Sequence, residues 1–210
     1  MQKFLQGRID LVKSLIDSDL SVHYADLVLI LCSVLSACAE HRWPGEYIDK
    51  KRFIELLVRY SPDKFRTSWV SVPSLIYDGL ISESQTPYGK PGNMTRIYRD
   101  DEIDLSLEDA SRKYPRVSAK DLRKHCYAYL IYDRLRCGYA HKYCPREGII
   151  SVRASHKKAR ISYIGRLSGA AIKRMGSFHL DYLISLAEYH VFNLPNSPSE
   201  CPSSWWICEG

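Results

Sequence analysis

The stretch LVLILCSVLSACA, residues 27–39, decides the fold class of this 210-residue chain. It contains serines but no charged residue, so a helix formed here would be apolar on nearly every face. It is too short and too interrupted by serine to span a bilayer, so we expect it at the centre of a helical bundle and expect no membrane association. The helix is predicted over 21–42, because WPG at 43–45 ends it.

Segments with helical spacing of apolar residues lie on both sides of this centre. Residues 1–17 have the pattern of a short amphipathic helix, and a further helix is predicted over 47–60, stopped by SPD. A short helix is expected over 68–80, and a last one over 177–192, ended by NLP. The segment 118–135, SAKDLRKHCYAYLIYDRL, is predicted as one regular helix with Ser118 as its N-cap.

Two parts of the chain break the helical pattern. Residues 82–105 hold several prolines and glycines and are predicted to form a long loop or small insertion. After Pro145 the apolar period changes to two, which predicts a small β-hairpin near 149–164. We therefore expect a mainly α fold: one helical-bundle domain over 1–194 and an aperiodic tail over 195–210, whose Trp205 and Trp206 dock it on the body or on a partner, or leave it mobile.

The composition limits the class of partner and the compartment. The chain has 30 Lys and Arg against 24 Asp and Glu, a formal net charge of +6. This balance favours a polyanionic partner without requiring one, since a mildly basic surface also serves solubility. The seven cysteines are irregularly spaced and are expected to be reduced thiols. The first residues carry scattered charges unlike a secretory signal, so we expect a cytoplasmic protein.

The candidate site is RLRCGYAHKYCP, residues 134–145, directly after the predicted helix. Cys137, His141 and Cys144 could contribute to a zinc site, with His125 and Cys126 upstream as possible additions, but a structural zinc usually takes four ligands and only three are obvious. Cys137 or Cys144 could instead be a nucleophile, with His141 as its base and the arginines lowering the thiol pKa. The plain alternative is that these are ordinary half-buried thiols at the polar end of a helix.

A third interpretation pairs Arg136 with His141. The planar guanidinium of an arginine matches phosphate oxygens, and a histidine can move a proton near neutral pH, which together suffice to cleave RNA without a metal or other cofactor. On a straight helix these side chains point about 140° apart. Gly138 could kink the helix between them, or a second copy of the chain could supply the complementary group. Arg134 would share a face with His141 and is the rival arginine; we assign Arg134 and Lys142 to substrate binding.

The stretch YDRLRCGYAH, which follows a helix in a mostly helical domain, resembles the HEPN superfamily, whose hallmark is R-x4-6-H. The resemblance implies a homodimer in which two such segments face each other and cut RNA without metal, leaving 2′,3′-cyclic phosphate ends, with Arg136 and His141 as the active residues. It also implies a toxin or an antiviral defence effector. Many members have Asn, Asp or His after the arginine, where this chain has Cys137.

One toxin branch of that superfamily extends the motif to R-x4-H-x-Y, which Tyr143 satisfies. In that branch the tyrosine is the target of nucleotidyl modification by a cognate antitoxin, which implies a nucleotidyltransferase partner here. The alternative from another class is a non-catalytic nucleotide- or RNA-binding module of HEPN type. In that alternative Arg136 and His141 only bind phosphate or make structural hydrogen bonds.

Overall fold

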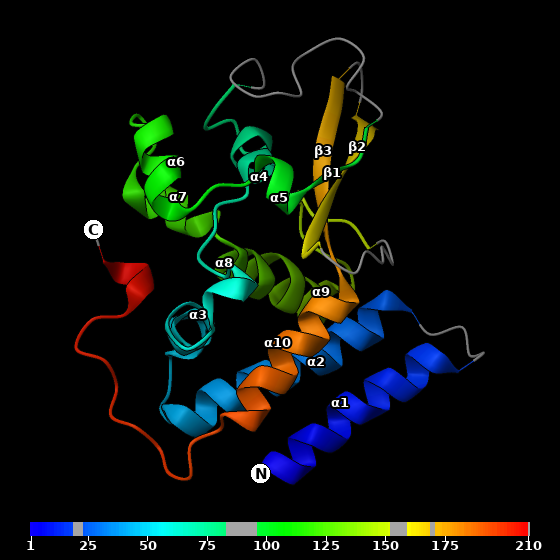
Figure 1. Cartoon of the computed structure of the whole chain (residues 1–210), viewed down its shortest axis with the longest axis vertical. Coiled ribbons are helices and arrows are strands. Elements are labelled where there is room, and N and C mark those ends of the chain that lie inside the picture. Colours follow the sequence, from blue (N-terminus) through cyan, green and yellow to red (C-terminus); the bar gives the residue numbers. More distant parts are fainter. Residues whose placement is uncertain (19–22, 83–95, 152–158, 169–170, 210) are drawn as a thin grey trace.

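The computed structural model describes residues 1–18, 23–82, 96–151, 159–168 and 171–209. These residues form a mainly helical fold with a three-stranded antiparallel sheet at one end (Figure 1). The predicted fold class is therefore confirmed.

The centre of the bundle is α2 (Tyr24–Arg42), which contains the apolar stretch that opened the sequence analysis. Helices α1 (Gln2–Asp17), α3 (Asp49–Arg59) and α10 (Leu180–Phe192) pack against it. Among the described helices, only α2 is long and apolar enough to cross a membrane, and 56% of that span is buried inside the chain. Its neighbours in the bundle thus account for its apolar composition.

Short elements connect the bundle to the sheet. They are η1 (Asp63–Phe65), α4 (Val72–Tyr77), β1 (Tyr98–Arg99), α5 (Asp100–Ile103) and α6 (Leu107–Lys113). The helix predicted over 68–80 begins only at Val72, because the Ser71 hydroxyl caps it by accepting from the Ser74 N–H. Of the predicted loop over 82–105, residues 83–95 lie outside the described residues, and 98–103 form β1 and α5.

The helix predicted over 118–135 is interrupted, which corrects the expectation of one continuous element. It divides into α7 (Ala119–Lys124), α8 (Tyr127–Leu130) and the π-helical segment η4 (Ile131–Arg136), and α9 (Cys137–Lys142) follows. The Ser118 cap is confirmed, since its hydroxyl accepts from the Asp121 N–H at 3.1 Å.

The interruption falls at Cys126, where long-range backbone bonds replace helical ones. The N–H groups of Tyr127 and Ala128 donate to the carbonyls of Trp69 and Thr67, at 3.0 and 2.9 Å. Cys126 itself is extended and forms an isolated bridge with Val70. Tertiary pairing therefore overrides a local sequence pattern that would continue the helix.

The hairpin lies later in the chain than predicted. Its strands are β2 (Ile161–Ser168) and β3 (Ala171–Phe178), and β1 pairs with β2 through Tyr98 and Tyr163. The predicted first strand contributes only a short parallel bridge, in which the Ile150 N–H donates to the Gly176 carbonyl at 2.9 Å, while residues 152–158 lie outside the described residues. Because β3 includes Ser177 and Phe178, the last helix begins at Leu180 and not at Ser177.

The C-terminal tail is docked on the body of the chain. The Trp206 N–H donates to the buried Glu55 carboxylate at 2.7 Å, and the Trp205 ring packs edge-on against Trp43 with centroids 5.7 Å apart. The short helix η5 (Trp206–Cys208) then lies against α3 (Figure 1). Of the alternatives for the tail, docking on the body is the one observed. All seven cysteines are free thiols, as expected.

Candidate functional site

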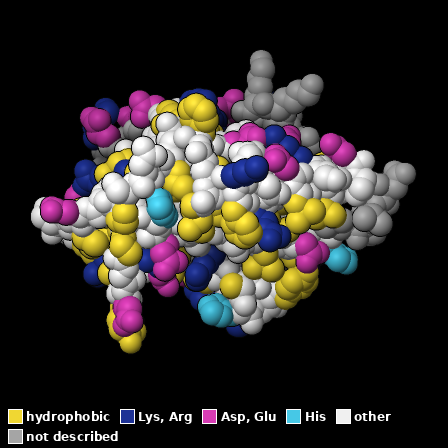
Figure 2. All heavy atoms as spheres, turned by 90° about the horizontal axis from the view of Figure 1, so that it is seen from below, with side chains coloured by type: hydrophobic (Ala, Val, Ile, Leu, Met, Phe, Trp, Pro, Cys, Tyr) yellow, Lys and Arg dark blue, Asp and Glu magenta, His cyan; other side chains and the backbone are white. Residues whose placement is uncertain are grey.

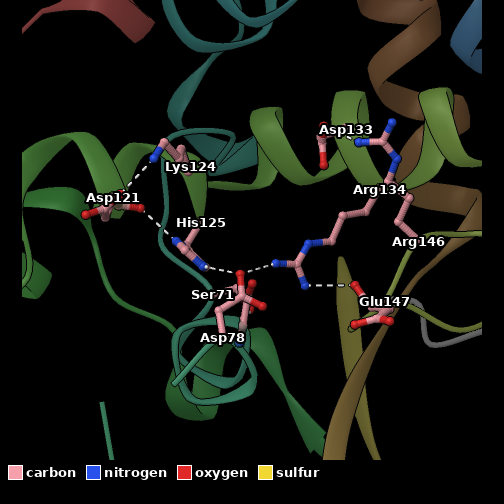
Figure 3. A network of polar contacts seen from close by, with 10 residues as sticks. Ser71, Asp78, Asp121, Lys124, His125, Asp133, Arg134, Arg146 and Glu147 are labelled. Atoms are coloured by element: carbon pink, nitrogen blue, oxygen red, sulfur yellow. Dashed lines mark hydrogen bonds and ion pairs between the residues drawn. The ribbon is translucent and has the colours of Figure 1, made fainter. Parts of the chain in front are cut away.

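Arg134 lies in η4 and is buried, with only 8% of its surface exposed. Its guanidinium donates to the Asp78 carboxylate at 2.6 Å and to the Glu147 carbonyl at 2.9 Å (Figure 3). The same Asp78 oxygen lies 3.0 Å from Nε2 of His125, whose Nδ1 is 2.7 Å from the Asp121 carbonyl. Arg134 thus joins η4 to the turn after α4 and to the 145–148 loop, instead of facing an open site.

The ionisation of Asp78 fits this role as a shared acceptor. Burial alone would raise the pKa of the Asp78 carboxyl, but the hydrogen bond with His125 and the charge of Arg134 outweigh burial and hold the pKa below its ordinary value. The carboxylate therefore stays charged near neutral pH and keeps the ion pair with Arg134.

Gly138 does not kink the helix, contrary to the expectation from sequence. It lies inside the regular helix α9 and has no positive φ. A Cβ at this position would lie 2.7 Å from the Cys144 carbonyl oxygen and 2.8 Å from the Arg146 nitrogen. Glycine is needed here so that the backbone of the following loop can lie directly on the helix.

Arg136, two residues after Arg134, is half-buried at the end of η4. Its guanidinium lies over the Tyr132 ring, 5.3 Å from the centroid, and Nη1 donates to Sγ of Cys137 at 3.8 Å. Burial opposes its charge, but the contacts with Cys137 and Tyr132 hold the pKa of Arg136 above its ordinary value. Within the described residues, no carboxylate forms an ion pair with Arg136.

Arg136 lines a cavity of about 560 Å³ between η4, the C-terminal half of α2 and the start of α3. The wall is mostly polar, with two arginines, two tyrosines and three carboxylates. Its residues are Ser36, Ala39, Glu40, Gly45, Glu46, Tyr47, Asp49, Arg52, Tyr132 and Arg136. The buried Arg52 is held by Asp49 and lies 3.6 Å from Glu40, so its charge is already matched inside the wall.

His141 and Lys142 are exposed at the end of α9. Tyr143 follows in the left-handed conformation, with φ of 54°, and ends the helix. Its side chain is 54% exposed and its phenol donates to the Asp26 carboxylate, a bond that raises the pKa of Tyr143. His141 is not among the residues that line the cavity of Arg136, and among the described residues no hydrogen bond joins the two motif side chains.

The zinc and thiol alternatives find no support in the arrangement of the side chains. Cys137 is buried, whereas His141 and Cys144 are exposed. In the described part of the chain, no group of three or more His, Cys, Asp or Glu side chains is placed to hold a metal ion. Cys137 has Arg136 as its polar neighbour instead of a histidine.

Comparison of the chain with family models, with curated proteins and with solved structures finds no match. The resemblance to the HEPN superfamily therefore depends on the residues from Arg136 to His141 and on the helical fold around them.

Several residues of this site were not identified from the sequence. Asp78, which pairs with Arg134, comes from a distant segment with no motif of its own, and His125 was not expected to contact the same Asp78 oxygen. Glu46 was assigned to a loop and Tyr47 to a helix start, yet both line the cavity of Arg136. A signal existed only in the nearby WPG, which ends α2 and turns the chain towards α3.

Proposed function

We propose that this chain is a metal-independent endoribonuclease of HEPN type that acts through Arg136 and His141. One observation carries the proposal. Of the two arginines in the motif, Arg136 lines an open cavity without a carboxylate partner in the described chain, whereas Arg134 is committed to Asp78. A guanidinium in that setting is available to bind a phosphate.

The chemistry needs only these two kinds of side chain. A neutral His141 removes the proton of a ribose 2′-OH, and O2′ attacks the adjacent phosphorus. The P–O5′ bond breaks, and the leaving 5′ oxygen takes up a proton as the 2′,3′-cyclic phosphate forms. Arg136 stabilises the negative charge that develops on the phosphate oxygens.

The biological setting proposed is that of a cytoplasmic toxin or antiviral effector that works as a homodimer on RNA. The exposed Lys142 would contact the substrate backbone. Tyr143 is accessible to a nucleotidyltransferase antitoxin, but its phenol donates to Asp26, so modification requires that bond to break.

The test is cleavage of single-stranded RNA in EDTA by the parent chain, Arg136→Ala and His141→Ala. The parent should produce 2′,3′-cyclic phosphate ends, and each variant should cut about a hundredfold more slowly. Arg112→Ala is a matched control, because Arg112 is exposed on α6 and pairs only with its helix neighbours Glu108 and Asp109. Parental cleavage rates in both motif variants, or activity that a chelator abolishes, would contradict the proposal.

A non-catalytic nucleotide-binding module is the second candidate. It is favoured by Cys137, which is buried beside Arg136, and by the three carboxylates in the cavity wall. In that case the parent chain would bind short RNA through Arg136 but leave it intact in the same experiment.

A further inference from the structure

We propose that the cavity beside Arg136 binds one unpaired guanine nucleotide of the RNA, and that Tyr47 is the aromatic surface on which its base stacks. This inference rests on the proposed function in one respect, since it assigns the nucleotide's phosphate to Arg136. It adds a residue that positions the substrate and a base preference that the motif itself does not contain.

Tyr47 has an unusual conformation for a large residue. Its backbone φ is 61°, in the left-handed region that favours glycine, and its side chain is 97% exposed. In the described part of the chain its ring packs against no other aromatic ring. Backbone strain of this kind clusters at sites that bind ligands, and an exposed aromatic ring beside a cavity offers a face on which a base can stack.

The neighbours of Tyr47 fit a nucleotide. Its cavity of about 560 Å³ lies within the usual range for small-molecule sites. Proteins bind unpaired bases by stacking them on aromatic rings, and Arg136 on the same cavity can reach a phosphate. Tyr47 and Arg136 line the same cavity, so one nucleotide could place its base on the ring and its phosphate at the guanidinium.

The carboxylates of the wall favour guanine over the other bases. Asp49 is held by Arg52 and Glu40 lies near the same arginine, which leaves Glu46 without an ion-pair partner among the described residues. Guanine presents two adjacent donors, N1–H and N2–H, to a single carboxylate. Every other base places a hydrogen-bond acceptor next to its donor, and a carboxylate repels that acceptor.

The charges of the wall also limit how much RNA it can hold. Arg52 and Arg136 face Glu40, Glu46 and Asp49, so the wall carries no net positive charge. A cavity wall without net positive charge does not bind many consecutive phosphates of an RNA backbone. It suits one nucleotide with a single phosphate contact.

The test measures fluorescence anisotropy of labelled pentanucleotides UUGUU, UUAUU, UUCUU and UUUUU in a His141→Ala background, which leaves the cavity intact and the RNA uncut and serves as the parent chain here. The parent chain should bind UUGUU about tenfold more tightly than the other three. Tyr47→Phe should keep this affinity, while Tyr47→Gly should weaken binding of UUGUU about tenfold or more. Glu46→Gln should bind all four oligonucleotides alike. Phe192→Ala removes another highly exposed aromatic ring, on α10 and outside this cavity, and should change nothing.

Tyr47→Gly also separates a binding role from a structural one. Glycine relieves the positive φ, so its melting temperature should equal or exceed that of the parent while binding is lost. Parental binding by Tyr47→Gly, or equal affinity of the parent for UUGUU and UUUUU, would overturn the inference. Cleavage without guanine preference would support the endoribonuclease and refute this inference. Guanine-selective binding that depends on Tyr47, without cleavage, would support this inference and refute the endoribonuclease.

Discussion

Arg134 and Arg136 lie two positions apart in the sequence, but their side chains lie in different environments. Arg134 is buried in an ion pair with Asp78 and a hydrogen bond to the Glu147 carbonyl (Figure 3). Arg136 instead lines the cavity. The π-helical turn η4 contains both. Such turns shift the faces of the residues they contain relative to a regular α-helix and are frequent at functional sites.

Replacing these arginines should therefore separate stability from activity. Arg134→Ala removes a buried guanidinium that pairs with the partly exposed Asp78 and donates to the Glu147 carbonyl, and should lower the free energy of unfolding by about 1–2 kcal/mol. Arg136→Ala breaks no ion pair among the described residues and loses only the contacts with the Tyr132 ring and Cys137, so it should lower the unfolding free energy by about 0.5–1 kcal/mol. Urea unfolding of both variants measures this. Equal destabilisation by the two changes would show that Arg136 is also structural.

Gly138 offers a second residue-scale prediction with an internal control. In Gly138→Ala the new methyl would meet the backbone of Cys144 and Arg146, which cannot move aside as a side chain can, so we expect a loss of about 1–3 kcal/mol in unfolding free energy. Gly7→Ala introduces the same methyl in α1, where nothing lies within 4 Å, and should stabilise by about 0.5–1 kcal/mol. Stabilisation by both changes would refute the close approach of the 144–146 loop.

At the scale of elements, Asp104 joins the bundle to the sheet. This fully buried carboxyl accepts hydrogen bonds from the phenol of Tyr127 in α8, from the phenol of Tyr163 in β2 at 2.6 Å, and from the Val72 N–H at the start of α4 at 3.0 Å. Burial raises the pKa of Asp104 to about 8, against the effect of these donors. One side chain thus links three elements that lie far apart in the sequence.

The protonation of Asp104 should make stability depend on pH. The pKa is higher in the folded chain than in the unfolded one, so the stabilisation is complete at low pH and is lost as pH rises towards 8. His190 acts in the opposite direction, because burial lowers its pKa to about 3, but that effect ends above about pH 6.5. Between pH 6.5 and 8.5 we therefore expect the unfolding free energy to fall by about 2 kcal/mol.

Asp104→Asn is the control for that fall. The amide is isosteric and does not titrate, so urea unfolding at pH 6.5, 7.5 and 8.5 should give a flatter profile than the parent. If parent and variant decline in parallel over this range, Asp104 is already ionised in the folded state and its three donors outweigh burial.

A comparison of the predicted and observed elements shows which features the sequence alone could predict. The central position of α2 and the Ser118 cap followed from local apolar spacing and local capping chemistry. The interruption at Cys126 could not be predicted, because it depends on backbone bonds to Thr67 and Trp69, more than fifty residues earlier. The hairpin was displaced because, of the alternating pattern that begins at Ile149, the described residues 149–151 make only a bridge to Gly176.

The same limit applies to the site. Arg136 and His141 could be chosen from their spacing, but the burial of Arg134 depends on Asp78, which a distant turn supplies. Tyr47 could not be identified because a positive φ at a tyrosine has no local sequence signal, and its place beside Arg136 results from the packing of α3 against α2. The motif residues could be recognised from their local spacing, whereas the residues that distant segments bring to the site could not be predicted.

At the scale of the whole molecule, the surface does not carry one extended basic track on the face shown in Figure 2. Lysines and arginines are interspersed there with acidic and apolar side chains. More than half of the apolar span in α2 is buried within one copy of the chain, so its composition does not call for a second copy. The case for a dimer now depends on the site alone, because His141 does not line the cavity of Arg136.

A composite site makes a specific prediction for mixed variants. If Arg136 of one copy acts with His141 of another, each variant alone is inactive, but a heterodimer of Arg136→Ala and His141→Ala has one site with both groups intact. Random exchange at equal concentrations makes about half of the dimers mixed, so about a quarter of the parental cleavage rate should return. Light scattering at micromolar concentration should show twice the chain mass of 24.2 kDa. A strict monomer, or a mixture as inactive as its components, would rule out a site shared between two copies.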